Sequence, residues 1–421
     1  MLEKKRLIYI KRRTSMQWIT MFIVIMPLLL QALLQFFNFP GVIKYTVDIA
    51  WITAVLYMLF SKGIKLQRKI VPLVIFIAVF GCYCLITYML NYQSVFYFLW
   101  GFRNNFRFYF AFLAILLFLE HDDIDCIFKI IDVLFVINIF VSIYQIFVLN
   151  LVKDFCGGIF GAETGSNAST LMFFSIVTAK TLLEYMNGRE KTAVCCTKCV
   201  ITLILAVFAE LKVFFAIFVL ILIVASFVTS FSVKKLAVAL IAVLLVSLSG
   251  TFYQMLFESE LSLEAFLAHF TYEHYASAED VGRFTAIPHI AKTILTNWSS
   301  QLLGLGLGNC DTSAFAICNT PFFQNHRSMN YIWFSSACWF LETGIVGLCS
   351  YLAFFIICFV KGLRLVKRRI GNLLYSQLSV IMSILCVILT FYNASLRTEI
   401  GFLAFFVLAL PFVKDKEVQL T

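Results

Sequence analysis

Apolar segments recur along the chain at the length needed to cross a bilayer, and short polar stretches separate them. A spanning helix needs about 20 mainly apolar residues, because each residue adds only about 1.5 Å across a hydrocarbon core about 30 Å thick. Such segments lie at 17–37, 42–60, 70–90, 99–119, 127–149, 167–186, 236–257, 344–360, 372–392 and 400–413. The pattern predicts a bundle of transmembrane helices.

The apolar stretch 198–231 is too long for a single crossing. After Lys198 its only charged residues are Glu210 and Lys212, and basic sequence flanks it on both sides. Because basic flanks favour the cytoplasm, we expect two crossings of roughly 17 residues, with the Glu-Leu-Lys tip outside. The prediction is then an all-α polytopic membrane protein with about twelve transmembrane helices.

The basic residues also orient this bundle. Most Lys and Arg fall in the terminal segments and in the loops of one side, which predicts that both termini are cytoplasmic. The first apolar segment has no A-x-A-like site after it, so we expect an uncleaved helix. The long, mildly acidic loop 258–330 then lies outside, inserted before the tenth helix of a single membrane domain, 1–421.

Composition supports this class and argues against others. Of the 421 residues, 62% are hydrophobic and only 13% are charged, which is more apolar surface than one water-facing core can bury. The net charge of +10 comes from short clusters between apolar runs, so we expect no nucleic-acid partner. Cys196 and Cys199 have the C-x-x-C spacing without a second pair, so no metal site is expected.

Arg103 and Arg107 are four residues apart and therefore share one helical face, in the outer third of the predicted span. Two interpretations stay open. Both side chains could extend to the outer head groups, or their guanidinium groups could bind a phosphate or pyrophosphate. Glu210 and Lys212 are likewise either the solvated tip of a turn or part of a site.

The outer loop contains the other candidates. Apolar residues spaced by three and four predict a surface helix, which Pro288 should kink or break near 284–287: Val281, Phe284, Ile287, Ile290 and Ile294. Arg283 either pairs with Glu279 or reaches a lipid head group. We expect the glycine-rich stretch 303–310 to be a flexible loop, and a disulfide between Cys310 and Cys318 stays open.

His326 and Arg327 lie in a polar cluster that opens an apolar segment. A neutral imidazole could accept a proton from a hydroxyl, since its ordinary pKa is about 6.5; the alternative is a loop histidine. Glu342 is about 24 Å further along an unbroken helix, too far to pair with His326 directly. Gly344 and Gly347 predict a bend there, so Glu342 is either a support of that bend or a second acid–base candidate.

The stretches "GRFTAIPHIAKTILTNWSSQLLGLGLGN", "NHRSMNYIWF" and "LETGIVGLCSYL" resemble the Wzy-type polysaccharide repeat-unit polymerases and their relatives, the O-antigen ligases. The topology is similar over nearly the whole chain, and the residue-level resemblance covers about 282–352. It implies a metal-independent glycosyltransferase of the GT-C class, without a cofactor, that uses undecaprenyl-diphosphate-linked glycans outside the bacterial cytoplasmic membrane. A chain-length regulator and a flippase are further implied partners.

The resemblance also implies residue roles. Arg283 would contact the lipid pyrophosphate, with Arg103, Arg107 and Arg327 nearby, and His326 would be the general base. Lys212 stands in "ELK" where relatives often have a Ser-Arg pair. A repeat-unit polymerase is the leading hypothesis. An O-antigen ligase that uses lipid A core as acceptor, or a twelve-helix transporter or flippase, are the alternatives.

Overall fold

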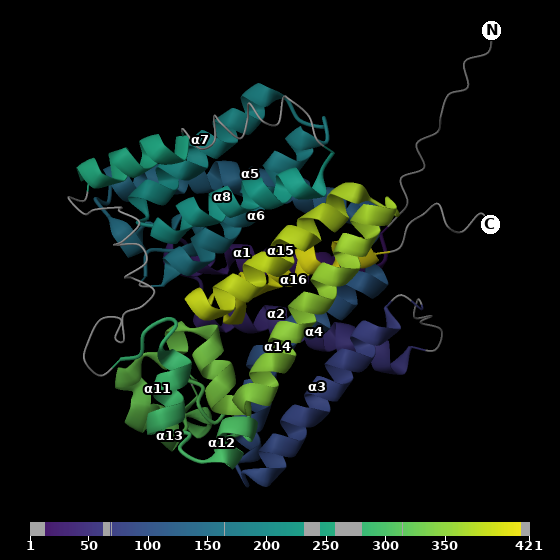
Figure 1. The fold of residues 1–421 in the computed structure, drawn as a ribbon, viewed down its shortest axis with the longest axis vertical. Helices are drawn as coiled ribbons and strands as arrows, with labels where there is room; N and C mark the ends of the chain where they lie inside the picture. The colour runs from purple at the N-terminus through teal and green to yellow at the C-terminus, as the bar shows by residue number, and fades with distance from the viewer. Residues whose placement is uncertain are drawn as a thin grey trace.

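The computed structural model describes residues 13–61, 68, 70–163, 165–230, 245–256, 280–313 and 315–413. These residues form helices, turns and connections, with no strand among them (Figure 1). The longer helices are α1 (Ser15–Gln35), α2 (Tyr45–Phe60), α3 (Val71–Leu90), α4 (Val95–Phe118), α5 (His121–Phe147), α6 (Ser166–Met186), α7 (Thr192–Phe208), α8 (Lys212–Val228), α14 (Ser335–Arg368), α15 (Leu373–Tyr392) and α16 (Gly401–Ala409).

Each predicted apolar segment coincides with a helix wherever the structure describes it, and residues 245–256 of the segment 236–257 are helical as well. Six of the described helices, α1, α2, α3, α5, α14 and α15, are long and apolar enough to cross a membrane. Three further apolar helices are shorter. The described chain is thus all-α with several helices of spanning length, and the total of about twelve crossings stays a prediction.

The hairpin predicted within 198–231 is confirmed. Helices α7 and α8 are each 17 residues long, and the chain reverses between them at residues 209–211. Glu210 occupies the turn with a positive φ of 51°, a left-handed conformation that a non-glycine residue adopts mainly in tight turns. The turn places Glu210 and Lys212 at one end of the bundle.

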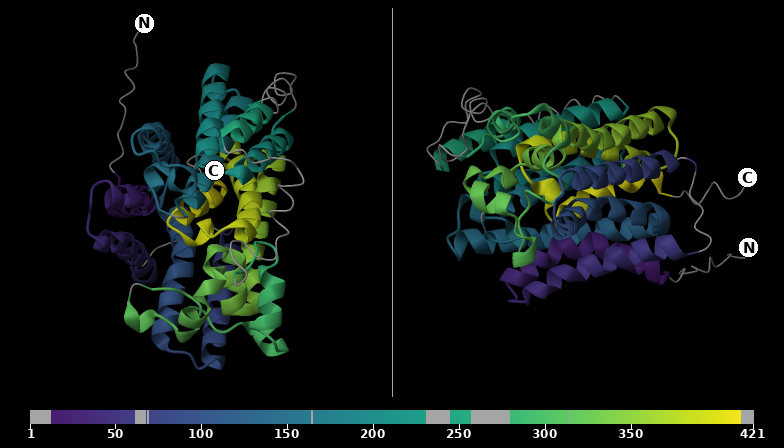
Figure 2. Two further views of the ribbon diagram at one scale, coloured as in Figure 1. Left: turned by 90° about the vertical axis from the view of Figure 1, so that its left-hand side faces the viewer. Right: turned by 90° about the horizontal axis from the view of Figure 1, so that it is seen from below.

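The helices run roughly along one another, and α1 and α2 cover one side of the bundle (Figure 2). Aromatic side chains fill the contact between α4, α14 and α16. Tyr109 of α4 is fully buried, with its ring centroid 4.9 Å from Phe354 and 5.2 Å from Phe405. Edge-to-face contacts of this kind fix the relative position of three helices that are distant in sequence.

Three short helices precede α14: α11 (Ala286–Thr293), α12 (Trp298–Leu303) and α13 (Pro321–His326). They gather at the end of the bundle where α3 ends (Figure 1). The predicted break near 284–287 is confirmed, because α11 begins at Ala286. Pro288 then lies in its first turn, where a missing backbone donor costs little.

Helix α14 bends sharply at Gly344, where φ is 63° and ψ is −167°. The glycine-rich stretch 303–310 packs into this bend, so the expectation of a flexible loop is wrong. The amide of Leu305 donates to the carbonyl oxygen of Leu341 (2.8 Å), and that of Gly306 donates to the carbonyl of Glu342 (2.9 Å). The bend predicted from the glycines is confirmed, and the open question of a disulfide is answered by two free thiols, Cys310 and Cys318.

Candidate functional site

A cavity of about 710 Å³ lies where helix ends from both halves of the chain meet. Its wall comes from the second half of α1, from Arg107 of α4, from the segments around α6 and α8, and from residues 392–400 between α15 and α16. The size falls in the usual range for small-ligand sites. Its charged lining consists of Arg107, Lys212, Arg283 and Arg397 with Asp154, Glu163, Glu210 and Glu399.

Three helices begin at this cavity. Residues 165–169 at the start of α6, 211–213 at the start of α8 and 398–400 just before α16 all line it. None of these helices has a side chain as its N-terminal cap. The start of a helix carries a partial positive charge and unsatisfied N–H groups, so three such starts favour an anion.

Arg107 is the least exposed cation of the lining, at only 4%. Its Nη1 donates to Glu399 Oε1 (2.8 Å), and its Nη2 donates to the carbonyl oxygen of Arg397 (3.4 Å). The guanidinium carbon also lies 4.8 Å from the ring centroid of Phe108 and 5.3 Å from that of Phe402. These contacts hold a charged group within an apolar bundle.

Arg397 lies in the 3-10 turn Ser395–Arg397 between α15 and α16. Its Nη2 is 3.3 Å from Asp311 Oδ2, and its Nε donates to Asn105 Oδ1 (3.3 Å). Burial alone would lower the pKa of Arg397, but the groups around it, chiefly Cys338 and Asp311, outweigh burial and raise that pKa. Arg397 therefore stays cationic at the cavity wall.

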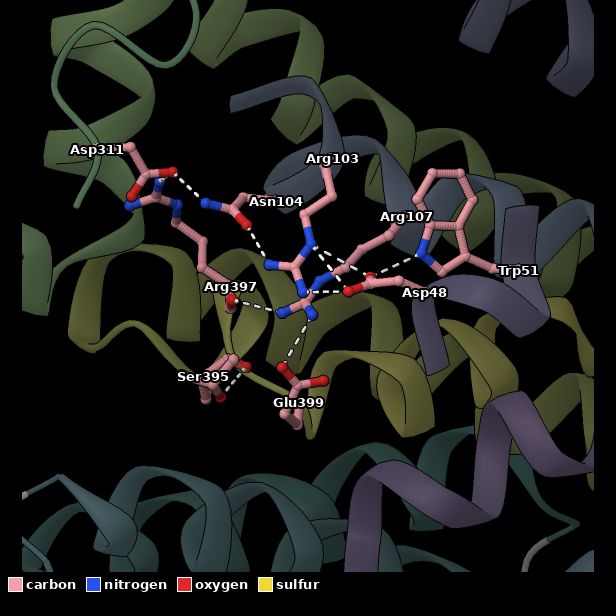
Figure 3. A network of polar contacts seen from close by, with 10 residues as sticks. Asp48, Trp51, Arg103, Asn104, Arg107, Asp311, Ser395, Arg397 and Glu399 are labelled. Atoms are coloured by element: carbon pink, nitrogen blue, oxygen red, sulfur yellow. Dashed lines mark hydrogen bonds and ion pairs between the residues drawn. The ribbon is translucent and has the colours of Figure 1, made fainter. Parts of the chain in front are cut away.

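A chain of polar contacts continues from Asp311 away from the cavity (Figure 3). Asn104 Nδ2 donates to Asp311 (2.7 Å), and Asn104 Oδ1 accepts from Arg103 (2.6 Å). Arg103 in turn forms an ion pair with Asp48 on α2 (2.5 Å), which also accepts a hydrogen bond from Trp51 (2.9 Å). The network joins α2, α4, the loop before α14 and the turn before α16.

Lys212 and Glu210 form an ion pair across the α7–α8 turn, with Nζ 3.4 Å from Oε1. Tyr253 donates a hydrogen bond to Glu210 (2.9 Å), and Lys212 Nζ lies 5.7 Å from the centroid of the Tyr253 ring. Both charged residues line the cavity. The tip therefore lies at the cavity wall, and its part in a functional site stays a prediction.

Arg283 also lines the cavity and is 8% exposed. Its guanidinium carbon lies 4.3 Å from the centroid of Tyr392, the last residue of α15. The proposed partner Glu279 lies outside the described residues. Of the seven predicted site residues, the structure brings Arg107, Lys212 and Arg283 to one cavity.

The other four lie elsewhere. Arg103 forms an ion pair with Asp48 in the polar network and does not line the cavity, whereas Arg107, on the same helix, does. Arg327 is exposed and belongs to the turn after α13. Arg103 and Arg327 therefore do not line the cavity of the other cations, and their binding of pyrophosphate stays a prediction.

His326 ends α13, where Phe322 lies beneath it with the two ring centroids 4.4 Å apart. Its Nδ1 is 3.1 Å from the carbonyl oxygen of Phe322. His326 lines a separate cavity of about 370 Å³ together with His289, and the two linings share no described residue. His326 therefore does not line the cavity that contains Arg107, Arg283 and Lys212, and its role as a base stays a prediction.

Glu342 is 1% exposed and lies beside the bend of α14, outside the lining of either cavity. Its carboxyl group faces the backbone amides of Gly308 and Cys310, and its charged neighbours are Asp311 and Arg397. Glu342 therefore joins the packed glycine-rich loop to the bend. This position agrees with the prediction that Glu342 supports the bend of α14. It also separates Glu342 from the cavity in which an acid or base would act.

Sequence reasoning missed Arg397, Glu399 and Asp154. The first two lie in "NASLRTEIG", a short polar stretch between two apolar helices, which is the pattern of an ordinary outer connection. Asp154 belongs to the connection between α5 and α6. The charges themselves were the signal in the first case, because Arg397 and Glu399 lie within a few residues of two apolar helices.

Among the described residues, no three His, Cys, Asp or Glu side chains group as a metal site would require. Comparison of the sequence with protein-family models and with curated proteins finds no match.

Proposed function

We propose that this protein is a glycosyltransferase that polymerises undecaprenyl-diphosphate-linked oligosaccharide repeat units at the outer face of a bacterial cytoplasmic membrane. The observation that carries the proposal is the cavity, where four cationic side chains and three helix starts meet. A diphosphate linked to a sugar suits such a wall, because guanidinium groups and helix N-termini are strong phosphate donors.

The carboxylates of the lining support a sugar as the other part of the ligand. The described wall has as many acidic as basic side chains, so some parts of it attract anions and other parts repel them. Carboxylates accept hydrogen bonds from hydroxyl groups, and Trp333, Phe334 and Tyr392 add aromatic surface against which sugar rings pack. A ligand with a charged and a hydroxyl-rich part fits this mixed lining better than a simple anion does.

The topology supports an outer location. The lining comes from the later part of α1, the end of α15, the starts of α6, α8 and α16, and the α7–α8 tip. In the predicted topology, in which the N-terminus is cytoplasmic, all of these helix ends are outside. Lipid-linked glycans would reach the cavity from that side of the membrane.

The reaction requires a sugar hydroxyl of one glycan to attack the anomeric carbon of another while the carrier diphosphate leaves. Charge grows on the departing diphosphate, and preorganised cations stabilise it most effectively in a site that excludes bulk water. Arg107, Arg283 and Lys212 would supply that stabilisation. A proton acceptor must take the hydroxyl proton, and no metal ion is assigned to the step.

Deleting the gene and separating the surface glycan on a gel tests this function against the alternatives. A polymerase mutant would keep a single-repeat product on the surface. A ligase mutant would attach no glycan and would accumulate long chains on the carrier lipid, and a flippase mutant would retain the repeat unit on the cytoplasmic side. Either of the last two results would replace the proposed activity.

A further inference from the structure

Asp154 differs from the other carboxylates of the cavity. Glu399 forms an ion pair with Arg107 at 2.8 Å, and Glu210 forms one with Lys212 at 3.4 Å. Glu163 is an exposed residue at the edge of the lining. Asp154 is half-buried in the wall, and the side chain that donates to its carboxylate is a neutral amide.

Two hydrogen bonds fix Asp154 to the start of α6. Asn167 Nδ2 donates to the Asp154 carboxylate, and Ser166 Oγ donates to the Asp154 backbone oxygen (3.0 Å). The residue lies in the 3-10 turn Lys153–Phe155, which Lys153 enters with a φ of 61°. The carboxylate is therefore held at a defined place on the wall, as a group that must meet a reacting atom has to be.

Burial and a neighbouring carboxylate make Asp154 a stronger base than an ordinary aspartate. Burial raises its pKa above the usual 3.8, and the neighbouring Glu210 raises it further. Arg283, Lys153 and the hydrogen bond from Asn167 lower the pKa, but the net direction is upward. A carboxylate with a raised pKa takes a proton more readily than an ordinary aspartate does.

We propose that Asp154 is a catalytic residue of this cavity, the base that accepts the proton of the attacking sugar hydroxyl. This inference rests on the proposed function. Arg283 interacts electrostatically with Asp154, so the base and a cation that binds the diphosphate are neighbours. A donor whose diphosphate lies at Arg283 would place its anomeric carbon close to both groups.

The step is balanced without a further reactant. The acceptor hydroxyl oxygen forms a bond to the anomeric carbon, and the bond from that carbon to the diphosphate oxygen breaks. The bonding electrons leave with the diphosphate, whose charge the cations of the cavity stabilise. The hydroxyl proton moves to the Asp154 carboxylate, and solvent removes it once the product has left.

The test compares Asp154→Asn with the wild type and with Glu190→Gln, in full-length purified protein. Asparagine preserves the shape of the side chain and cannot act as a base. Glu190 lies between α6 and α7, outside the cavity, and is a matched exchange of carboxylate for amide. The readouts are single-turnover polymerisation of lipid-linked repeat units and calorimetric binding of farnesyl diphosphate, which carries a prenyl chain and a diphosphate but no sugar.

We expect Asp154→Asn to slow the chemical step by roughly 100-fold or more. Its affinity for farnesyl diphosphate should stay within a few-fold of wild type, and Glu190→Gln should match wild type in both readouts. A wild-type rate in Asp154→Asn would overturn the inference, as would a parallel loss of rate and diphosphate affinity, because that would show a binding role. If the wild type itself formed no polymer, the proposed function would fail instead.

Discussion

Arg107 of α4 donates a 2.8 Å hydrogen bond to Glu399, a residue 292 positions further along the chain. The contact closes the inner wall of the cavity and joins α4 to the turn that precedes α16. Removing one member of such a pair leaves the other charge without compensation in an apolar surrounding.

Replacing Arg107 by methionine should therefore cost stability as well as ligand affinity. We expect the free energy of unfolding to fall by about 3 kcal/mol. This is the lower end for a broken buried ion pair, because the Glu399 side chain is 26% exposed. The double variant Arg107→Met with Glu399→Gln should recover part of this loss, with a coupling of about 1–3 kcal/mol in a double-mutant cycle of unfolding. Strictly additive single effects would show that the two residues do not stabilise each other.

Gly344 should not tolerate a side chain. An added Cβ would lie 2.2 Å from the carbonyl oxygen of Leu302, and the positive φ of 63° already disfavours other residues. Gly344→Ala should lower the melting temperature and the yield of folded protein. Gly41→Ala is the control, since no described atom lies within 4 Å of its added Cβ. Equal melting temperatures for the two variants would contradict the packing described for the bend.

Binding of farnesyl diphosphate should separate the two cavities. Arg283→Ala removes a cation of the larger cavity and should weaken binding by at least about tenfold, the equivalent of 1.4 kcal/mol. His326→Ala changes only the smaller cavity and should leave this affinity unchanged. The opposite order of effects would show that the diphosphate binds beside His326.

The pH dependence of the single-turnover rate should report Asp154. A protonated carboxylate cannot accept the hydroxyl proton, so the rate should fall as pH falls through the raised pKa of Asp154. Glu210→Gln removes a charge that raises this pKa, so the acidic limb should move to lower pH. Arg283 and Lys153 act in the opposite direction and are left intact. If Glu210→Gln leaves the pH at which the rate falls unchanged, a group other than Asp154 controls the pH dependence of the rate.

The helices could be predicted from the sequence because apolar length is what lipid requires of a spanning segment. The hairpin at Glu210 followed from the same requirement and from the basic flanks. The start of α14 was missed, since Ser335, Ser336 and Glu342 are buried against protein and so lower the apolar signal of a helix that is nonetheless inside the bundle. Local composition cannot reveal burial of this kind.

The site was only partly predictable for a related reason. Arg107 was singled out because a charge within an apolar segment is costly, whereas the role of Arg283 came from the family resemblance and that of Lys212 stayed open. Glu342 was placed by its distance along an unbroken helix, whereas its surroundings depend on how residues 303–310 pack against the bend of α14. That packing is long-range, and no periodicity along the chain encodes it.

Polymerisation by the purified protein tests the central claim most directly. Wild-type protein in detergent, given only undecaprenyl-diphosphate-linked repeat units, should form polymer. It should do so without a membrane gradient or a further protein, and also when a chelator removes metal ions. Arg283→Ala should lose most of this activity while it remains folded. Absence of polymer with the wild type, or a wild-type rate with Arg283→Ala, would contradict the assignment of the cavity as the site of glycan transfer.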